Sequence, residues 1–335
     1  TPMRFPGKVI IDPIGKRIVI ADSGHHRLIV TDPSGSQATL IGSGRPGHQD
    51  GPLGEARFQD PQGMVLDGDT LYVADNLNHM VRKVDLKAGL VTTIAGTGKM
   101  LTSYSTLRGR SSNPTRYALS NPWDLALVSG RLYIAMAGTH QLAVLNLSAN
   151  SIAPYAGNGV EDVKDGSLAK SCLAQPSGLA TDGKYLFVVD SEGSSLRAVT
   201  LPPGNAVGTL VGTTGLPMFK SLFAFGDRDG VGSAVRLQHP IGVAFADGKI
   251  YVADTYNHKI KLVDPAARSC VTLAGQRRRG NSLEPLQLHE PAGVAVHGQT
   301  LFIADTNNHR IVTVDLASRQ ARAMNITGLG PPPPA

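Results

Sequence analysis

The sequence predicts an all-β chain folded as a six-bladed β-propeller, and three observations support this prediction. The 335 residues include 38 glycines and 22 prolines, which separate many short apolar runs. No long segment shows a sustained helical period. Six segments begin alike around a proline, at intervals of 55, 61, 54, 64 and 51 residues: Pro6, Pro61, Pro122, Pro176, Pro240 and Pro291. Repeats that cannot bury both faces alone stack radially into a ring of blades, each with four antiparallel strands.

Each strand of a repeat has a recognisable sequence. The first begins at the proline, which suits this position because a first residue needs no ladder donor. The second ends in Asp in most repeats, as in "KIYVAD", and a polar turn leads to a third strand such as "KIKLVD". The fourth usually ends in Gly, as in "LVTTIAG", although the last copy, "QARAMNITG", is looser. We place a proline-rich tail or linker at 329–335 and the blades at about 1–44, 45–98, 99–158, 159–213, 214–276 and 277–328.

The segments that link the blades also repeat. Three of them place Asp-Gly eleven and ten residues before the proline: "DGPLGEARFQDP", "DGSLAKSCLAQP" and "DGVGSAVRLQHP". The linkers at 97–120 and 212–226 are longer than the others. An apolar residue three positions before each proline is predicted to plug the space between two blades: Met3, Phe58, Leu119, Leu173, Leu237 and Leu288.

Asp and His recur four residues apart at the turn between the second and third strands. The acids are Asp22, Asp75, Asp190, Asp254 and Asp305, with Met136 in the third repeat. The imidazoles are His26, His79, His140, His258 and His309, with Ser194 in the fourth repeat. We interpret the motif as structural. The aspartate is expected to accept backbone N–H bonds from its own turn, and the histidine to bond the next blade through one ring nitrogen. Left-handed backbone geometry is expected at Asn78, Asn257 and Asn308.

A ring of zinc ligands is the functional alternative for this motif. Zinc holds three or four ligands at about 2 Å, and equivalent residues on separate blades lie too far apart for that. We therefore expect no metal, no cofactor and no catalytic residue in the motif.

Composition restricts the function classes further. The net charge of +6 is mildly basic, and the sharpest basic run is 277–279. Two cysteines, Cys172 and Cys270, fit neither a metal-ligand spacing nor a disulfide scaffold, so free buried thiols are expected. No apolar run is long enough to cross a membrane, and no signal peptide is evident. We expect a soluble protein of the cytoplasm or an organelle lumen, with compartment and oligomeric state left open.

Two segments, "DTYNHKI" and "DTNNHRI", resemble NHL repeats, which are named for their Asn-His-Leu signature. The resemblance covers residues 1–328. The segments "NPWDLAL", "SEGSSLRAV" and "LFAFGDRDGVG" are similar to one subfamily, in which a thioredoxin-like domain precedes a six-bladed NHL propeller. In that subfamily the thioredoxin-like domain carries the CxxC-type cysteines. The resemblance therefore implies that this chain is the propeller portion of such a protein, or a relative that lacks the redox domain, and that any redox activity belongs to a domain outside it.

These observations favour a non-catalytic scaffold, linked by the resemblance to thiol-redox or stress functions. The expected partner is a protein or an adjacent thioredoxin-like domain, and nucleic acid is not expected. The residues expected to contact it are Trp123, Asp124, Phe219, Phe223 and Phe225, because aromatic side chains in segments that do not repeat are candidates for a partner surface. Two alternatives stay open: a metal-dependent lyase or hydrolase with its site in the propeller funnel, and RNA binding through 277–279 and the basic 108–116 loop.

Overall fold

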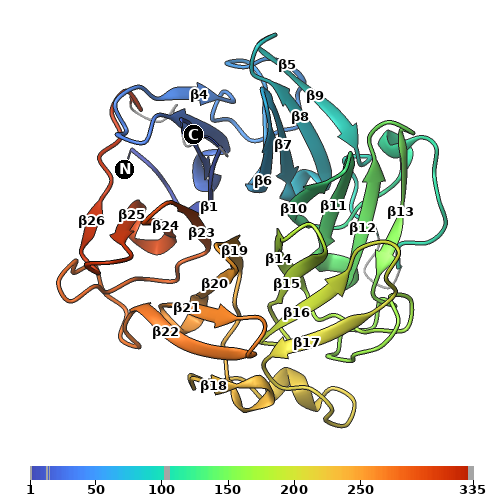
Figure 1. Cartoon of the computed structure of the whole chain (residues 1–335). Coiled ribbons are helices and arrows are strands. Elements are labelled where there is room, and N and C mark those ends of the chain that lie inside the picture. Colours follow the sequence, from blue (N-terminus) through green and yellow to red (C-terminus); the bar gives the residue numbers. More distant parts are fainter. Residues whose placement is uncertain (1, 13, 15, 102–105, 331–335) are drawn as a thin grey trace.

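The computed structural model is a closed ring of six blades, and it describes residues 2–12, 14, 16–101 and 106–330 (Figure 1). Each blade is an antiparallel meander with its first strand at the axis and its fourth on the outside. The predicted all-β, six-bladed architecture is confirmed. Residues 331–335 of the predicted tail and residues 102–105 of the 97–120 linker lie outside the described residues.

The strands follow one another around the axis in sequence order. Blade 1 contains β1 (Pro6–Ile11), β2 (Ile18–Asp22), β3 (Arg27–Thr31) and β4 (Thr39–Ile41). Blade 2 contains β6 (Pro61–Asp67), β7 (Thr70–Asp75), β8 (Met80–Asp85) and β9 (Leu90–Ala95). Blade 3 contains β10 (Pro122–Val128), β11 (Arg131–Met136), β12 (Gln141–Asn146) and β13 (Ser151–Ala156). Blade 4 contains β14 (Pro176–Thr181), β15 (Tyr185–Asp190), β16 (Ser195–Thr200) and β17 (Val207–Val211). Blade 5 contains β19 (Gly242–Ala246), β20 (Lys249–Asp254), β21 (Lys259–Asp264) and β22 (Ser269–Gly275), and blade 6 contains β23 (Gly293–His297), β24 (Thr300–Asp305), β25 (Arg310–Asp315) and β26 (Ala321–Ala323).

Two blades have a fifth strand that the repeat pattern did not predict. β5 (Gly51–Pro52) and β18 (Gly230–Val231) pair antiparallel with the outer strands β9 and β22. Both belong to Asp-Gly linkers, which pass along the outside of the blade that they enter. Gly51 and Gly230 have φ values of 141° and 155°, a conformation that side chains disfavour, so glycine is required after the aspartate.

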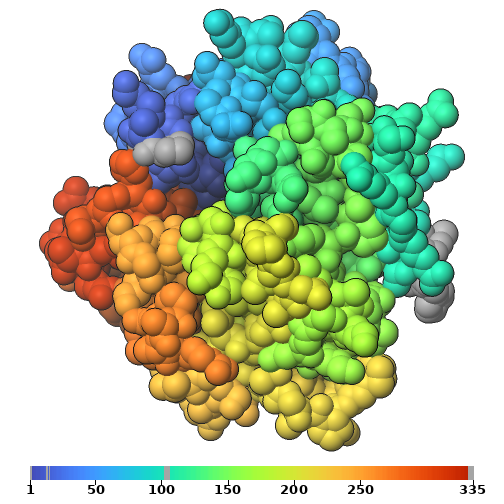
Figure 2. Space-filling model, turned by 45° about the vertical axis from the view of Figure 1, so that its right-hand side comes forward, coloured from blue at the N-terminus to red at the C-terminus, as the bar shows by residue number. Residues whose placement is uncertain are grey.

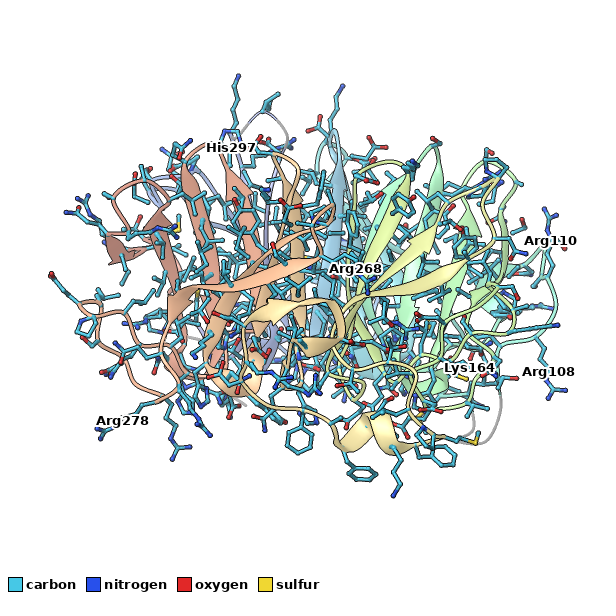
Figure 3. The ribbon with its side chains drawn as sticks, turned by 60° about the horizontal axis from the view of Figure 1, so that its bottom comes forward. Arg108, Arg110, Lys164, Arg268, Arg278 and His297 are labelled. Carbon is cyan, nitrogen blue, oxygen red and sulfur yellow. The ribbon has the colours of Figure 1, made fainter. Side chains whose placement is uncertain are left out.

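Short 3-10 turns connect the second and third strands of five blades: η1 (Ser23–His25), η2 (Asn76–Asn78), η4 (Ala137–Thr139), η7 (Thr255–Asn257) and η8 (Thr306–Asn308). Three more lie in linkers: η3 (Pro114–Arg116), η5 (Lys220–Phe223) and η6 (Gly232–Ala234). The turns and linkers form one face of the ring, which we call the linker face. The hairpins that end the inner strands form the opposite, hairpin face. Figure 3 shows Arg278 of a linker on one side and His297 of a hairpin on the other.

The apolar residue three positions before each proline fills the space between two blades, as predicted. Met3 is 6% exposed and the other five are fully buried. Leu237, for example, lies in one cluster with Val189 of blade 4 and Val252 of blade 5. The hydrophobic core is therefore divided into six clusters, each between neighbouring blades.

Contacts between the first and last blades close the ring. The N–H of Phe5 donates to Nδ1 of His309 at 3.1 Å, and Oγ1 of Thr306 donates to the carbonyl oxygen of Pro6 at 2.8 Å. After β26 the chain crosses to blade 1, where Leu329 is 4% exposed within the core. In blade 1 this C-terminal segment takes the position that a linker has in other blades. Arg27 of the third strand donates to its carbonyl oxygen at Leu329, at 3.5 Å.

We predict that Leu237→Ala lowers the free energy of unfolding by about 2–5 kcal/mol, because it leaves a cavity between two blades. Leu90→Ala is the matched control, since Leu90 is 45% exposed on β9, and it should cost about 0.5 kcal/mol or less. Urea denaturation followed by circular dichroism measures both variants. Equal losses would contradict the role of Leu237 as a plug.

Candidate functional site

The repeated aspartate fixes each linker to its blade. All five carboxylates are fully buried. Each accepts a backbone N–H from the residue two positions before the proline of its own blade, at 2.6–2.8 Å; these donors are Arg4, Gln59, Ala174, Gln238 and His289. The prediction that the aspartates bond the backbone of their own turn is wrong. The carboxylate turns inward instead, because the buried linker N–H needs an acceptor.

The second oxygen of the aspartate binds a cation of the third strand. Asp75 Oδ2 accepts Arg82 Nη1 at 2.8 Å, and both side chains are fully buried. Comparable pairs join Asp22 to Arg27, Asp190 to Arg197 and Asp305 to Arg310 at 2.8–2.9 Å. Burial raises the pKa of Asp75 and of Asp190 to about 6, against the opposing effect of the arginines.

The Asp-Gly linkers add another carboxylate to the same cation. Asp50 accepts Arg82 Nη2 at 2.6 Å and the N–H of Thr93, on the outer strand, at 2.9 Å. Equivalent bonds join Asp165 to Arg197 and Thr209, and Asp229 to Lys261 and Thr272. The Asp-Gly motif therefore joins the linker to the third and fourth strands of the blade that it enters.

The repeated histidine bonds the next blade. Nδ1 of all five rings accepts the N–H of the residue that precedes the next proline, at 3.1–3.3 Å, and Ser194 Oγ does the same in blade 4. The predicted bond through one ring nitrogen is confirmed. Burial lowers the pKa of these rings, which keeps the accepting nitrogen unprotonated.

The left-handed residue of the turn is the histidine and not the asparagine, so that expectation is wrong. The five histidines have φ values of 52–57°. Asn78 lies inside the turn, where its amide donates to Asp75 Oδ2 at 2.8 Å and to the carbonyl oxygen of Gly47 at 2.7 Å.

Blade 3 shows that the motif is architectural. Met136 replaces the aspartate and is fully buried, and Ala143 stands where blade 2 has Arg82. A different bond joins the linker to this blade, because Gln141 Oε1 accepts the N–H of Leu107 at 2.7 Å. Replacing both members of a buried ion pair by apolar groups is tolerated, whereas removing one member is costly.

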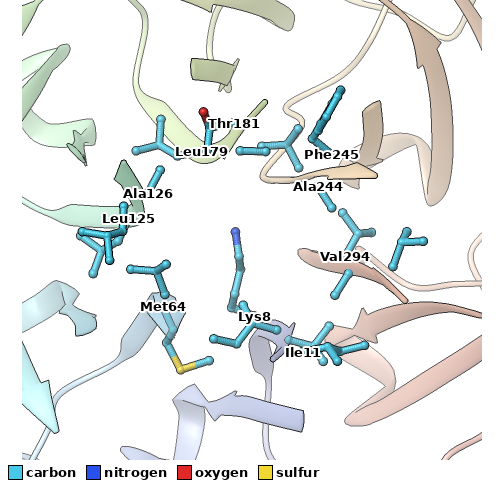
Figure 4. Close-up of a pocket in the computed structure, with 18 residues that line it drawn as sticks. Lys8, Ile11, Met64, Leu125, Ala126, Leu179, Thr181, Ala244, Phe245 and Val294 are labelled. Carbon is cyan, nitrogen blue, oxygen red and sulfur yellow. The ribbon is translucent and has the colours of Figure 1, made fainter. Parts of the chain in front are cut away.

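An ion pair crosses the propeller axis. Lys8 of β1 binds Asp124 of β10, and the two residues are 7% and 1% exposed. Asp124 Oδ2 also accepts the N–H of Leu179 at 2.9 Å, and burial raises the pKa of Asp124. Lys8 points into a central cavity of about 240 Å³ with aliphatic walls, which include Met64 and Val294 (Figure 4). Asp124 is thus held inside the ring, away from any partner at the surface.

The linker that enters blade 5 carries the densest group of exposed apolar side chains. Among the described residues, thirteen large apolar side chains are exposed, and five of them lie within 214–225, a segment that we call the apolar loop: Leu216, Met218, Phe219, Phe223 and Phe225. Phe223 is 76% exposed. Beside the loop, Leu216 and Met218 line a pocket of about 660 Å³.

The apolar loop continues into a group of three ring side chains in contact. The ring of Phe225 lies 5.9 Å from that of His239, which lies 4.6 Å from that of Tyr256. His239 Nε2 contacts Glu192 of blade 4 at 3.2 Å. The structure thus brings the three predicted phenylalanines together on one loop. Trp123 belongs to the inner strand of blade 3, where its Nε1 is buried without a hydrogen-bond partner in the described structure.

The metal-ligating side chains and the thiols of the described residues were the other candidates for chemistry. No group of three or more His, Cys, Asp or Glu side chains there is placed to hold a metal ion. Cys172 and Cys270 are free and buried, and burial raises the pKa of both thiols, that of Cys270 to about 12. None of the helices in the described ranges is long and apolar enough to span a membrane.

Comparisons with known proteins agree with this geometry. The NHL repeat family matches residues 237–261 and 288–313, in blades 5 and 6. NHL repeat-containing protein 2 of Bos taurus is 42% identical over 353 residues, which cover 95% of this chain and 47% of that protein. The chain is an NHL-repeat propeller. Protein SUPPRESSOR OF QUENCHING 1, chloroplastic, of Arabidopsis thaliana is also 42% identical and covers the whole chain, which spans 33% of that protein. The chain spans about half the length, or less, of these curated relatives.

Solved structures share the fold at low identity. A chain of the nidogen/laminin complex aligns with a TM-score of 0.59 and 14% identity over 90% of each chain. Streptogramin B lyase aligns with a TM-score of 0.56 and 10% identity, over 98% of this NHL-repeat chain and 85% of its own. Similarity at this level shows the fold alone and transfers no activity.

Sequence reasoning missed Lys8 and the role of the Asp-Gly motif. Lys8 stands two residues after its proline, where four inner strands have glycine and one has Asp124. A Cβ added to Gly63 would lie 2.3 Å from the Asp124 Cα, so this level of the axis has room for two side chains only where the neighbours are glycine. The sequence feature that could have predicted the axial ion pair is that Lys8 and Asp124, which carry opposite charges, occupy the same position of two repeats.

We predict that Asp254→Asn removes a pH-dependent contribution to stability. Lys261 lies 4.0 Å from Asp254, and burial raises the pKa of this carboxyl from 3.8 to about 7. The folded state therefore binds a proton more tightly than the unfolded state, so the contribution is complete below about pH 4 and is lost as the pH rises through about 7. The free energy of unfolding of the wild type, relative to the variant, should fall by on the order of 2 kcal/mol between about pH 5 and pH 7.

Urea denaturation at both pH values measures this difference. Asp315→Asn is the control, because hydrogen bonds from Ser318 lower the pKa of this exposed carboxyl, which therefore titrates below this range. Its difference from the wild type should stay constant. A constant difference for Asp254→Asn as well would contradict the raised pKa.

We predict that both thiols of the folded chain react with a disulfide reagent at least about tenfold more slowly than in urea, because thiolate is the reacting form and burial disfavours it. Absorbance of the released aromatic thiol measures the rates at about pH 7.5. In Cys172→Ala only Cys270 can react, so this variant shows which of the two measured rates belongs to Cys270. Rates as fast in the native protein as in urea would show that the thiols are accessible.

Proposed function

We propose that this propeller is a non-catalytic scaffold that holds a protein partner against the apolar loop. The observation that carries the proposal is the group of five exposed apolar side chains within 214–225. Several exposed apolar side chains on one loop are costly in water, and such groupings mark interaction sites. The loop lies on a rigid frame of blades, and large aromatic side chains supply most of the binding energy at interfaces.

The partner that we propose first is a thioredoxin-like domain of the same protein, or a client of such a domain, in a soluble compartment. Two observations support this choice. The chain covers 47% of NHL repeat-containing protein 2 of Bos taurus, so that relative contains further polypeptide. Both thiols of this chain are buried with raised pKa values, so redox chemistry would need cysteines outside it.

Hydrogen–deuterium exchange compares the complete gene product with residues 1–335 alone. We expect the amides of 214–225 to exchange more slowly in the complete product, because a docked domain excludes water from the loop. The thioredoxin-like part added separately should bind the chain, and Phe223→Ala should weaken that binding on the order of tenfold or more.

Leu90→Ala is the control for this variant, because Leu90 is also exposed but lies on the outer strand of blade 2. It should leave the affinity unchanged. Identical exchange of 214–225 in both forms, together with equal binding by the two variants, would refute the loop as the docking site.

A further inference from the structure

The surface of blade 3 is cationic without exposed acidic side chains. Asp124 is the one acidic residue between Asp85 and Glu161 in the sequence, and it is buried at the axis with Lys8. The same stretch contains six exposed basic residues: Lys87 in the hairpin between β8 and β9 of blade 2, and Lys99, Arg108, Arg110, Arg116 and Arg131 in blade 3 and the linker that enters it. The linker before blade 3 lacks the Asp-Gly motif whose carboxylate binds a cation in blades 2, 4 and 5. This part of the surface therefore attracts anions.

None of these six cations forms an ion pair with another part of the described structure, whereas Arg27, Arg82, Arg197, Lys261 and Arg310 all do. Figure 2 shows blade 3 and its linker, drawn in greens, along the right-hand surface of the molecule. In Figure 3 Arg108 and Arg110 extend outward on the side opposite Arg278. The two basic segments of the sequence, 108–116 and 277–279, therefore do not form one surface.

Two of the guanidinium groups that form no ion pair lie at one crevice. Arg110, from the linker, and Arg131, at the start of β11, line a crevice of about 230 Å³ between blades 3 and 4. Arg110 Nη2 donates to Ser151 Oγ at 2.9 Å, which directs it along the blade. The polar lining also includes Tyr133 and Asn146, and it contains no carboxylate. A lining of hydrogen-bond donors and cations suits an oxyanion.

The crevice is held open by aromatic packing. The rings of Tyr133 and Tyr155 meet edge to face at a centroid distance of 4.9 Å. The hydroxyl of Tyr155 donates to the carbonyl oxygen of Thr200 on blade 4 at 2.6 Å, so the ring spans both blades. Val144, Ala153 and Pro202 form apolar walls, against which the methylene groups of a side chain can pack.

We propose that this crevice binds a carboxylate side chain from an acidic, extended segment of a partner polypeptide, with the rest of the segment lying along the cationic surface of blade 3. The planar guanidinium fork matches a carboxylate in a bidentate way, and the crevice of about 230 Å³ has room for such a side chain. Single-stranded nucleic acid would need exposed aromatic rings for base stacking, and residues 106–200 of the described structure expose no large apolar or aromatic side chain. The site lies on a different blade from the apolar loop and is independent of the function proposed above.

Fluorescence polarisation with a labelled hexaglutamate peptide tests the proposal on residues 1–335, at about 50 mM and 200 mM salt. We expect saturable binding, and a loss of about tenfold or more in Arg110→Gln/Arg131→Gln. The matched control is Arg277→Gln/Arg278→Gln, which removes the same charge from exposed arginines on the opposite side of the ring and should change the affinity less than about twofold. Thermal unfolding checks that all variants fold.

A second variant separates the fork geometry from charge alone. Arg110→Lys/Arg131→Lys keeps both charges but cannot form bidentate bonds, and it should bind the peptide at least about threefold more weakly than the wild type. Equal losses in the two glutamine variants, or wild-type binding by the lysine variant, would reduce the site to non-specific attraction and overturn it. Absence of peptide binding at low salt would overturn it too. Tighter, Arg131-dependent binding of a mixed-sequence RNA of about twelve nucleotides would assign the surface to nucleic acid instead.

Discussion

The bond between the buried aspartate and the linker N–H is the constraint on which the rest of the structure depends. A propeller blade cannot bury its faces alone, so the segment that enters it must hold the plug residue at a fixed depth between two blades. The carboxylate does this because it accepts the N–H of the residue directly after the plug, as Gln59 follows Phe58 and Gln238 follows Leu237. The cation on the third strand then neutralises the carboxylate inside the blade. A buried N–H without this acceptor would cost about 1–3 kcal/mol at each blade.

The junction between blades depends on two residues with left-handed backbone. The histidine of one blade has positive φ, and so does the residue that donates to it from the next linker, such as Asp60 with 54° and Glu290 with 51°. Both conformations are strained for residues other than glycine, and the hydrogen bond between them offsets that strain. The same junction between His309 and Phe5 closes the ring, so closure uses the ordinary contact between neighbouring blades and needs no strand exchanged between the ends of the chain.

The sequence allowed the fold to be predicted because each blade repeats the same physical requirement at the same spacing. Six plugs, five aspartates and five histidines gave the number of blades and the place of the turns. The direction of each bond could not be predicted in this way. A carboxylate at a strand end, such as Asp75, can accept from its own turn or from a linker 16 residues earlier, and the spacing is compatible with both. The crevice between blades 3 and 4 could not be predicted for the same reason. Arg110 and Tyr155 line it together only because of the path that the linker takes over blade 3 in the folded structure.

The polar groups free to bind a partner lie mainly where the repeat is interrupted, because the repeated aspartates and histidines of the described residues already accept internal hydrogen bonds. In blades 2, 4 and 5 the linker carboxylate is used by a buried cation, and the histidine nitrogen is used by the next linker. Blade 3 has lost the aspartate, the cation and the linker carboxylate together, and Met136 and Ala143 fill the space. Its remaining arginines are exposed and form no ion pair within the described residues. The linker into blade 5 departs from the pattern by an insertion and not by a loss. It keeps its Asp-Gly motif, and the inserted segment before this motif exposes Phe219 and Phe223 on the surface. One interruption therefore presents charge and the other apolar area, so a partner that engaged both would be acidic in one segment and apolar in another.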